Sequence, residues 1–489
     1  MKIFDLIDEN YIISKDDIFD TECSSIASRE TKDKDALLFL LPKAMGKEEN
    51  EYNLSECRAK AVVAEQNVSI KCSLPIIRVS DARAAYSVAL SRYYDINYKN
   101  LSIIGITGTN GKTSTATIIF EALRHLGKKC GFIGTGKILI NEKRLSDEGY
   151  SMTTPDPDVL YKSLSEMQKS DCEFVVMEVS SHALALKKVL PIRFRVAAFS
   201  TLSSEHMDFH KDIENYYEAK RELFSLCDSA VINVDDKYGK RLYESLNCKK
   251  VSVGIIENAD CYITDLELDG LEKTSFIYRK GKIKFPVNLK LPGTFNVYNA
   301  HLSISVLIEL GVKPCEVKEA VSRVEKIEGR MEIIKDSVTV VIDYAHTPLA
   351  LETVLKTLNS NKNTGQKLCC VFGCGGERDR EKRAVMGKIA TENADFTIIT
   401  EDNNRGESFD SILSDIENGI ALGAPYTVIR KREEAIFSAI MRANDNDIVA
   451  LIGKGDERYK ITGDKKIPFD ERVIVKCANL ARNGVKNEN

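Results

Sequence analysis

The feature that most restricts the fold of this sequence is a pattern that recurs along most of its length. A short apolar run rich in β-branched residues is followed by a polar or glycine-containing loop and then by a helix-like segment. The runs begin the stretches 101–108, 174–183, 196–206, 230–236, 339–348, 367–379, 395–404 and 447–457. Strands that alternate with helices are typical of parallel sheets. The pattern therefore predicts an α/β fold, with ligands bound beyond the carboxyl ends of the strands.

The length of 489 residues is enough for about three domains at roughly 100–200 residues each. We place one boundary near residue 97, after a helix-like segment, and a second near residue 329. The predicted domains are 1–97, 98–329 and 330–489. Residues 251–290 are rich in strand-forming residues and turn signals, which predicts a small antiparallel insertion in the middle domain.

Charge and composition indicate which partners to expect. The net charge of −4, from 69 basic and 73 acidic residues, gives no general reason to expect nucleic acid or an anionic membrane as a partner. The apolar runs are shorter than the roughly 18 residues of a membrane span, and the first residues do not resemble a signal peptide. The thirteen cysteines form no C-x-x-C pair, which is typical of free thiols in a reducing cytosol. We therefore expect a cytoplasmic protein.

The stretch "GITGTNGKTST" (105–115) lies between a predicted strand and a predicted helix. Gly108 and Gly111 allow backbone N–H groups to turn inward around phosphate oxygens, and the helix directs its positive end at the same anion. Lys112 can reach terminal phosphates, and the Thr113 hydroxyl can bind Mg²⁺. The glycine spacing differs from the general G-x-x-x-x-G-K-[ST] pattern. We nevertheless predict a nucleotide phosphate loop here, the alternative being a glycine-rich turn with an incidental lysine.

A phosphate loop does not by itself name a reaction, because kinases, switches and ligases all contain one. Glu178 ends a predicted strand, where its carboxylate can reach Mg²⁺. His206 follows the next strand, and because Mg²⁺ prefers oxygen ligands, spacing alone favours a solvated or structural histidine. Lys220 lies on a helix-like segment, where spacing alone favours a solvated lysine.

Taken together, the motifs resemble those of the Mur ligases, cytoplasmic enzymes that add amino acids to peptidoglycan precursors. The motifs "GITGTNGKTS", "TTPDP", "MEVSSHALAL", "HMDFH", "YYEAKRELF", "FNVYNA", "GRMEII", "DYAHTP", "GCGGERDREKR" and "GKGDE" occur in the family's order over nearly the whole chain. The succession of "TTPDP", "MEVSSHAL" and "DYAHTP" is most similar to that of members that attach the third residue, usually meso-diaminopimelate or L-lysine, to UDP-MurNAc-L-Ala-D-Glu.

The resemblance implies an N-terminal α/β domain for the UDP precursor, a central P-loop ATPase and a C-terminal Rossmann-like domain for the amino acid, in a monomeric enzyme. The ATP-binding residues implied are Gly108, Thr109, Asn110, Gly111, Lys112, Thr113, Ser114, Asn299, Arg330 and Asp343. One or two Mg²⁺ ions would be held by Thr113, Glu178, His206 and Lys220. Catalytic roles are implied for Lys112, Lys220, Arg330 and His206, with Lys220 matching a lysine that the family carbamylates.

The mechanism implied is activation of a carboxylate as an acyl phosphate. The acyl phosphate is then attacked by the amine of the incoming amino acid, and ADP and phosphate are released. The protein must neutralise several negative charges that approach one another. Closure of the C-terminal domain would recruit Arg330 and exclude water.

The choice of amino acid depends on residues 401–406, "EDNNRG", which are similar to a "DNPR" motif of diaminopimelate-adding members. A distal carboxylate favours a planar arginine fork, so we expect Arg405 to bind meso-diaminopimelate. The alternatives are a solvated loop arginine, with lysine or another diamino acid as substrate. The amino-acid-binding residues implied are Arg378, Asp402, Asn403, Arg405, Gly453 and Glu457.

The nucleotide-sugar side departs most from the family: "ASR" (27–29) stands where "DSR" is usual, and Lys188 where an arginine is expected. The residues that match precursor-binding positions are Ser28, Thr153, Thr154, Ser180 and Lys188. A paralogous ligase that joins an amino acid to another carboxylate is therefore an alternative. A nucleotide-binding regulator or scaffold without ligase activity is a further one, against which the retained lysines, Glu178 and His206 argue.

Overall fold

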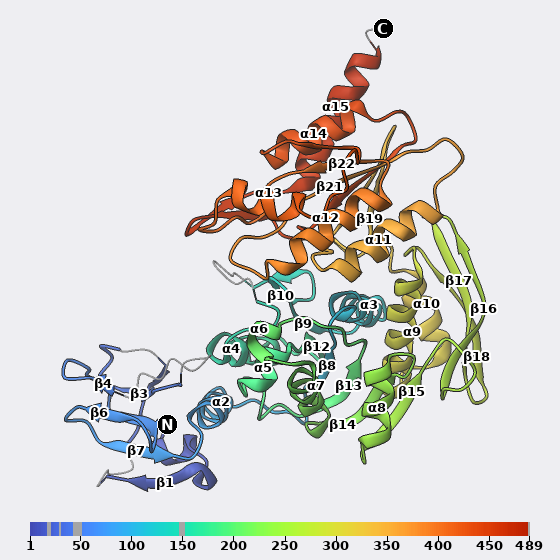
Figure 1. Cartoon of the computed structure of the whole chain (residues 1–489). Helices are drawn as coiled ribbons and strands as arrows, with labels where there is room; N and C mark the ends of the chain where they lie inside the picture. Colours follow the sequence, from blue (N-terminus) through green and yellow to red (C-terminus); the bar gives the residue numbers. More distant parts are fainter. Residues whose placement is uncertain (17–20, 29–30, 43–50, 146–151, 488–489) are drawn as a thin grey trace. The chain divides into compact units, whose positions relative to one another are not determined.

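The computed structural model describes residues 1–16, 21–28, 31–42, 51–145 and 152–487. Arg29 of the "ASR" stretch lies outside these residues. The chain forms two compact units, in which strands and helices alternate along the sequence (Figure 1). The first unit comprises Met1–Ile263, Tyr278–Phe285 and Tyr298–Val321, and the second comprises Thr264–Ile277, Pro286–Val297 and Ser322–Asn489.

A parallel sheet forms the centre of the first unit. Its strand order is β9 (Cys130–Gly134), β12 (Phe174–Glu178), β8 (Ser102–Thr107), β13 (Phe194–Phe199), β14 (Cys227–Asn233) and β15 (Lys249–Val253). β10 (Lys137–Ile140) and β11 (Lys143–Arg144) extend it in antiparallel fashion beyond β9. The central strands are almost entirely buried, which explains their continuous apolar runs.

Helices connect these strands and cover the sheet. They are α3 (Lys112–His125), α4 (Pro157–Lys169), α5 (Ser181–Ala185), α6 (Met207–His210), α7 (Ile213–Arg221), η2 (Glu222–Ser225), α8 (Lys237–Ser245), α9 (Thr294–Glu309) and α10 (Pro314–Ser322). α3 begins directly after the phosphate loop and packs on β8, β9 and β12 through buried residues such as Ile118 and Leu123.

The amino-terminal part of the first unit has its own sheet. The order is β1 (Ile12–Lys15), β7 (Ile76–Val79), β5 (Ala61–Glu65), β3 (Ala36–Phe39) and β2 (Ser25–Ala27), parallel except for β1. The buried ring of Tyr86 on α2 (Ala82–Tyr93) packs against Phe39 of β3. α1 (Ile3–Leu6), η1 (Glu9–Tyr11) and the paired strands β4 (Glu51–Asn53) and β6 (Ser69–Lys71) complete this part.

The second unit is built on another mainly parallel sheet. Its order is β19 (Glu332–Lys335), β20 (Thr339–Asp343), β24 (Ile448–Ile452), β21 (Leu368–Phe372), β22 (Phe396–Ile399) and β23 (Tyr426–Val428), with only the β19–β20 pair antiparallel among these described strands. The remaining elements are α11 (Pro348–Ser360), α12 (Glu381–Asn393), α13 (Phe409–Glu417), α14 (Arg432–Arg442), α15 (Glu471–Asn487), β25 (Tyr459–Thr462) and β26 (Lys465–Pro468).

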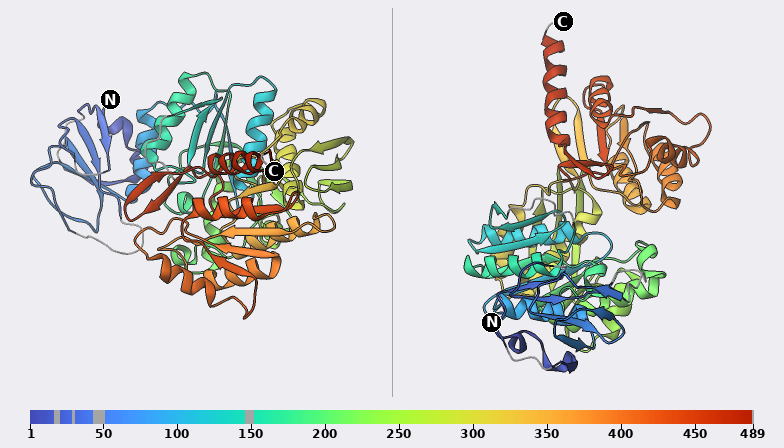
Figure 2. Two further views of the ribbon diagram at one scale, coloured as in Figure 1. Left: turned by 90° about the horizontal axis from the view of Figure 1, so that it is seen from above. Right: turned by 90° about the vertical axis from the view of Figure 1, so that its left-hand side faces the viewer.

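Two apolar clusters form the core of the second unit, one on each face of its sheet. Leu351 of α11 and Met386 of α12 belong to one cluster, and Ile436 of α14 and Val475 of α15 belong to the other. The C-terminal helix α15 extends beyond the strands of this sheet (Figure 2). Nowhere in the described part of the chain is a helix long and apolar enough to cross a membrane.

The predicted α/β class with mainly parallel sheets is confirmed, and each predicted strand is present. The predicted antiparallel segment 251–290 was too long, because β15 pairs in parallel with β14. The hairpin strands begin only at β16 (Cys261–Asp269) and continue through β17 (Lys273–Lys280) and β18 (Ile283–Leu289). The short turns that join them are typical of antiparallel neighbours.

Candidate active site

The phosphate loop connects β8 to α3, and two glycines allow its close approach to neighbouring chain. Gly108 has φ 148° and Gly111 has φ 84°, backbone angles that residues with a side chain rarely adopt. A Cβ at Gly108 would lie 2.0 Å from the Ser200 Oγ, and one at Gly111 would lie 2.5 Å from the Asn299 Oδ1. The loop therefore requires glycine at both positions, and it lies against Asn299, as the predicted ATP site requires.

Two lysine side chains meet at one carbonyl of this loop. The Lys112 Nζ donates to the Gly108 O (2.9 Å) and the Thr109 O (2.8 Å). The buried Lys220 Nζ, which lies 4.5 Å from the centre of the Tyr216 ring, also donates to the Gly108 O (2.9 Å). Burial lowers the pKa of Lys220 well below its usual value, and the neighbouring Lys112 lowers it further. The Lys220 amine is thus readily deprotonated.

Glu178, at the carboxyl end of β12, lies beside the start of α3. The parallel register places it opposite Ile106 of β8, one residue before the end of that strand. The Thr113 Oγ1 donates to the Glu178 Oε2 (3.0 Å), and the fully buried carboxylate also accepts from Thr135. A hydroxyl and a carboxylate at this spacing are hard oxygen donors that fit Mg²⁺.

His206 precedes α6 in a left-handed backbone conformation, with φ 59°. Its ring packs edge-on against His182, with centroids 4.8 Å apart, and its Nε2 lies 3.9 Å from the Glu205 Oε2. Burial lowers the pKa of His206, and Lys112 and Lys220 lower it further while Glu205 opposes them. A neutral imidazole can bind a metal. Within the described ranges, no three His, Cys, Asp or Glu side chains form a metal-holding group.

The residues predicted to bind the precursor fall into two groups. Thr154 donates from its Oγ1 to the Glu178 O (2.9 Å) and accepts from the Ser180 N (2.9 Å), while the Thr153 Oγ1 lies 3.2 Å from the Thr135 Oγ1. These threonines and Ser180 therefore adjoin Glu178. Lys188 lies next to this segment, because its Nζ pairs with Asp156 (2.6 Å) and lies 4.0 Å from the Met152 Sδ. Ser28 instead hydrogen-bonds to Tyr86 of α2.

In the second unit, Arg330 and Asp343 lie together at the end of β20. The Asp343 carboxylate accepts from the Met331 N (2.7 Å) and the Ala345 N (2.8 Å). Burial raises the pKa of Asp343, although Arg330 and the two N–H groups oppose the rise. The Arg330 guanidinium lies over the Tyr344 ring, 4.3 Å from its centre. The arrangement places a cation and a hydrogen-bond acceptor side by side.

The predicted amino-acid site contains a buried network centred on Lys454. The Lys454 Nζ lies 3.5 Å from the Asp402 Oδ1 and 3.2 Å from the Glu457 Oε2, and it donates to the Asn403 Oδ1 (3.0 Å). The Asn403 Nδ2 donates to the Glu457 Oε2 (2.8 Å). Burial raises the pKa of Glu457, whereas Lys454 and Arg432 outweigh burial and lower that of Asp402. A Cβ at Gly453 would lie 2.8 Å from the Asp402 Oδ2.

Arg378 and Arg405 lie near the same glycine: a Cβ at Gly375 would lie 3.1 Å from the Arg405 Nη1 and 3.7 Å from the Arg378 Cγ. The Arg405 Nη1 donates to the Gly376 O (2.8 Å) and the Asn403 O (3.2 Å), so its guanidinium is held in place. Burial and then the like charge of Arg378 lower the pKa of Arg405, while Asp402 opposes them. Two guanidinium groups beside two carboxylates form a site that suits a ligand carrying both charges.

Several residues of these sites carried no signal in the sequence. Thr135, which holds Glu178, follows a strand without a polar motif, and its contact depends on β9 lying beside β12. His182, on the short helix α5, packs against His206, and His210, at the end of α6, packs against His182. Lys454 differs from these, because it stands within the recognised motif "GKGDE", and that position was the sequence signal that could have found it. Its burial beside Asp402 and Glu457 shows only in the structure.

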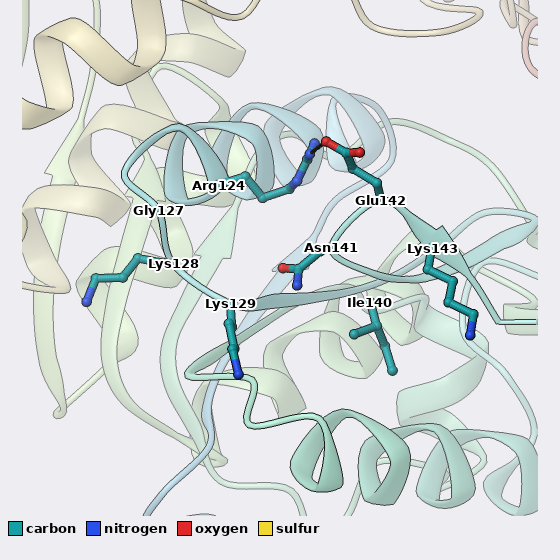
Figure 3. A pocket seen from close by; sticks show the side chains of 8 residues that line it. All are labelled: Arg124, Gly127, Lys128, Lys129, Ile140, Asn141, Glu142 and Lys143. Carbon is teal, nitrogen blue, oxygen red and sulfur yellow. Dashed lines mark hydrogen bonds and ion pairs between the residues drawn. The ribbon is translucent and has the colours of Figure 1, made fainter.

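A separate cavity of about 490 Å³ lies at the far end of α3 (Figure 3). Its cations include Arg124, which pairs with Glu142, and Lys128, which pairs with Glu173 (2.9 Å). The fourteen residues of α3 separate it from the phosphate loop by about 20 Å, at 1.5 Å per residue. This cavity is therefore not part of the nucleotide site.

The fold and this geometry define a class: an α/β protein with a phosphate loop at the carboxyl end of a parallel sheet. The sequence model of the Mur ligase middle domain matches residues 106–307, and that of the Mur ligase glutamate ligase domain matches residues 329–455. The chain therefore belongs to the Mur ligase family. It is an enzyme, an ATP-dependent ligase, and its architecture is consistent with the three-domain fold of that family.

Two curated relatives are similar over most of their length. UDP-N-acetylmuramoyl-L-alanyl-D-glutamate–2,6-diaminopimelate ligase 1 of Clostridium acetobutylicum is 39% identical over 82% of each chain. The ligase of the same name from Syntrophomonas wolfei is 34% identical over 99% of this chain and 100% of its own. A solved structure of a UDP-N-acetylmuramoyl-L-alanyl-D-glutamate–2,6-diaminopimelate ligase has a TM-score of 0.63 and 28% identity, covering 94% of this chain and 95% of its own.

Proposed function

We propose that this enzyme joins meso-diaminopimelate to UDP-MurNAc-L-Ala-D-Glu during peptidoglycan precursor synthesis, as a cytoplasmic monomer. The observation that carries the proposal is the charge pattern of the amino-acid site. Meso-diaminopimelate has two carboxylates and two amines, and the site offers two guanidinium groups, Arg378 and Arg405, beside Asp402 and Glu457. Lysine lacks the second carboxylate, so it would leave an arginine without a partner.

The ATP end of the reaction rests on the first unit and on Arg330 and Asp343. Lys112 and the loop N–H groups would hold the phosphates, with Asn299 beside the loop. Asp343, with Arg330 beside it, would accept hydrogen bonds from the ribose. ATP supplies the phosphoryl group that activates the acceptor carboxylate as an acyl phosphate. Mg²⁺ would be held by Thr113 and Glu178 together with His206 and a modified Lys220.

The acceptor and the amine are the groups that this chain must orient. The precursor would be held beside Glu178 by Thr153, Thr154 and Ser180. In this position the carboxylate of the precursor would approach the phosphate loop. The amine attacks the activated carbonyl carbon, an amide C–N bond forms, and phosphate leaves. Exclusion of water protects the activated carboxyl from hydrolysis. We propose the three domains 1–97, 98–329 and 330–489 for precursor, ATP and amino acid.

Carbamylation of Lys220 is supported by its lowered pKa, because only the neutral amine reacts with CO₂. The product is a carbamate, formed with loss of one proton, which changes a neutral amine at the Gly108 carbonyl into an anionic metal ligand. Growth of a carbamate signal in ¹³C NMR after addition of labelled bicarbonate would test this. The signal should be missing in Lys220→Ala. If the wild-type protein also shows no carbamate signal after labelled bicarbonate is added, Lys220 is not carbamylated.

The substrate assignment is tested by phosphate release from the purified protein. ATP, UDP-MurNAc-L-Ala-D-Glu and one of meso-diaminopimelate, lysine or ornithine are combined, and each component is omitted in turn. We expect release only with both acceptor and amine present, and most with meso-diaminopimelate. Release that ignores the UDP precursor but responds to another carboxylate would favour the paralogous ligase, and ATP binding without release would favour a binding protein.

A further inference from the structure

We propose that Thr135 is a positioning residue that couples the acceptor subsite to the metal-binding carboxylate, an inference that rests on the proposed function. Thr135 directly follows β9, next to the strand that ends in Glu178. Its N–H donates to the Glu178 Oε1 (3.1 Å), and its Oγ1 donates to the Glu178 Oε2 (3.2 Å). One residue thus contacts both oxygens of the carboxylate.

The orientation of the Glu178 side chain is set by these contacts together with the phosphate loop. The Thr113 Oγ1 adds a third hydrogen bond, at 3.0 Å to Oε2. The carboxylate also fills the space beside Gly134, where an added Cβ would lie 2.4 Å from Oε1. Glu178 is fully buried, so a change in these partners is not compensated by bulk water. Thr135 therefore fixes which lone pairs of Glu178 remain directed toward a metal.

Thr135 also contacts the segment that would bind the acceptor. The Thr135 Oγ1 lies 3.2 Å from the Thr153 Oγ1, and the Gly136 N donates to the Met152 O (3.2 Å). A hydroxyl has one proton to donate and can accept others. Because the Thr135 Oγ1 donates its one proton to the Glu178 Oε2, it accepts from the Thr153 Oγ1. If the bound UDP precursor accepts a hydrogen bond from the Thr153 hydroxyl, Thr135 loses that donor. The hydrogen bonds by which Thr135 orients the Glu178 carboxylate would then change.

A continuous chain of contacts therefore runs from Thr113 through Glu178 and Thr135 to Thr153. The two ends of this chain are predicted to serve different substrates, ATP with its metal and the UDP precursor. Outer partners of metal-binding carboxylates commonly change affinity or activity by 10–100-fold when they are removed. A hydroxyl that served only the local turn would not affect both substrates.

The test compares Thr135→Val, which keeps the branched shape but loses the hydroxyl, with Thr135→Ser, which keeps the hydroxyl. We expect Thr135→Val to weaken Mn²⁺ binding in the presence of ADP, followed by electron paramagnetic resonance, by about 10–100-fold. It should also raise KM for the UDP precursor while leaving KM for meso-diaminopimelate within about threefold. Thr135→Ser should retain both properties within about threefold.

Two further variants separate this role from a loss of folding. Gly134→Ala keeps the Thr135 hydroxyl but places a methyl group 2.4 Å from the Glu178 Oε1 and 2.6 Å from the Phe132 Cε1, so it should weaken Mn²⁺ binding and also lower the melting temperature. Thr353→Val removes a hydroxyl that bonds to the Leu349 O (2.7 Å) on α11, and it should leave Mn²⁺ binding and both KM values unchanged. Melting temperatures of all variants are recorded in parallel.

The outcomes distinguish the inference from the function on which it rests. A wild-type protein that does not join the two substrates rejects the proposed function. If the wild type is active and Thr135→Val matches it in Mn²⁺ affinity and precursor KM, the positioning role is wrong. Equal damage by Thr135→Ser and Thr135→Val would also reject it, because the hydroxyl would then not be the important group.

Discussion

Replacement of Arg405 by alanine should separate two amino-acid substrates that differ by one carboxylate. The Arg405 guanidinium is partly buried and is held by the Gly376 and Asn403 carbonyls, so it is oriented before a ligand arrives. Removal of one partner from a buried charge pair costs about 2–5 kcal/mol. Partial exposure places Arg405 at the lower end, about 2–3 kcal/mol, which corresponds to roughly 30- to 150-fold in kcat/KM.

The matched comparison is Arg378→Ala. Arg378 carries the same charge as Arg405 and also lies near Gly375, but its side chain is exposed. Exposed ion pairs contribute about 0–1 kcal/mol, so its loss should cost at most about fivefold. Two arginines that differ mainly in burial therefore give different predicted losses.

The assay is phosphate release with saturating ATP and UDP precursor, in which either meso-diaminopimelate or lysine is varied. Arg405→Ala should reduce kcat/KM for meso-diaminopimelate by roughly 30- to 150-fold, as estimated from burial, but reduce kcat/KM for lysine by less than about threefold. Equal losses with both substrates would refute the idea that Arg405 binds the distal carboxylate. A larger loss in Arg378→Ala than in Arg405→Ala would refute the argument from burial.

Three other predictions concern the first unit. Lys112→Ala should reduce phosphate release by on the order of 10²–10³ or more without changing the circular dichroism spectrum, and a fully active variant would reject the phosphate-loop assignment. Gly108→Ala should lower the free energy of unfolding by about 1–3 kcal/mol, and with it the melting temperature, because the added Cβ would collide with the Ser200 Oγ. An unchanged melting temperature would contradict this. His301 is fully buried, and burial lowers its pKa to about 3 from 6.5. The unfolded chain takes up the proton first, so the free energy of unfolding should fall as pH drops from about 6.5 toward 3, by up to about 4 kcal/mol. In urea titrations across this range, His301→Gln should show a weaker dependence on pH, and an equal dependence in both proteins would exclude His301 as its source.

The sequence was sufficient for features that are encoded locally. The apolar run 102–107 followed by glycines and Lys112 predicted β8, the loop and α3, because each depends on residues adjacent in the chain. Thr135 could not be found in this way. Its contact with Glu178 exists because β9 and β12 are neighbours in the sheet, and the order of strands is not written in either strand.

Charge environments were equally hard to predict. Spacing alone favoured a solvated lysine at position 220. The structure buries it and brings it to the same carbonyl as Lys112, although the two are far apart in sequence. The start of the antiparallel insertion was also misjudged, because a β-rich segment does not indicate whether its partner will run parallel or antiparallel, and residues 251–253 belong to β15, which is parallel to β14.

The convergence of Lys112 and Lys220 on the Gly108 oxygen has a consequence for handling the protein. Two ammonium groups this close would repel each other, and the lowered pKa of Lys220 avoids that repulsion because its amine loses the proton. Any small polyanion that enters, even pyrophosphate, should favour the protonated form of Lys220 and raise the melting temperature. Simple thermal-shift measurements could then rank inhibitor fragments for this loop before the natural substrates are in hand.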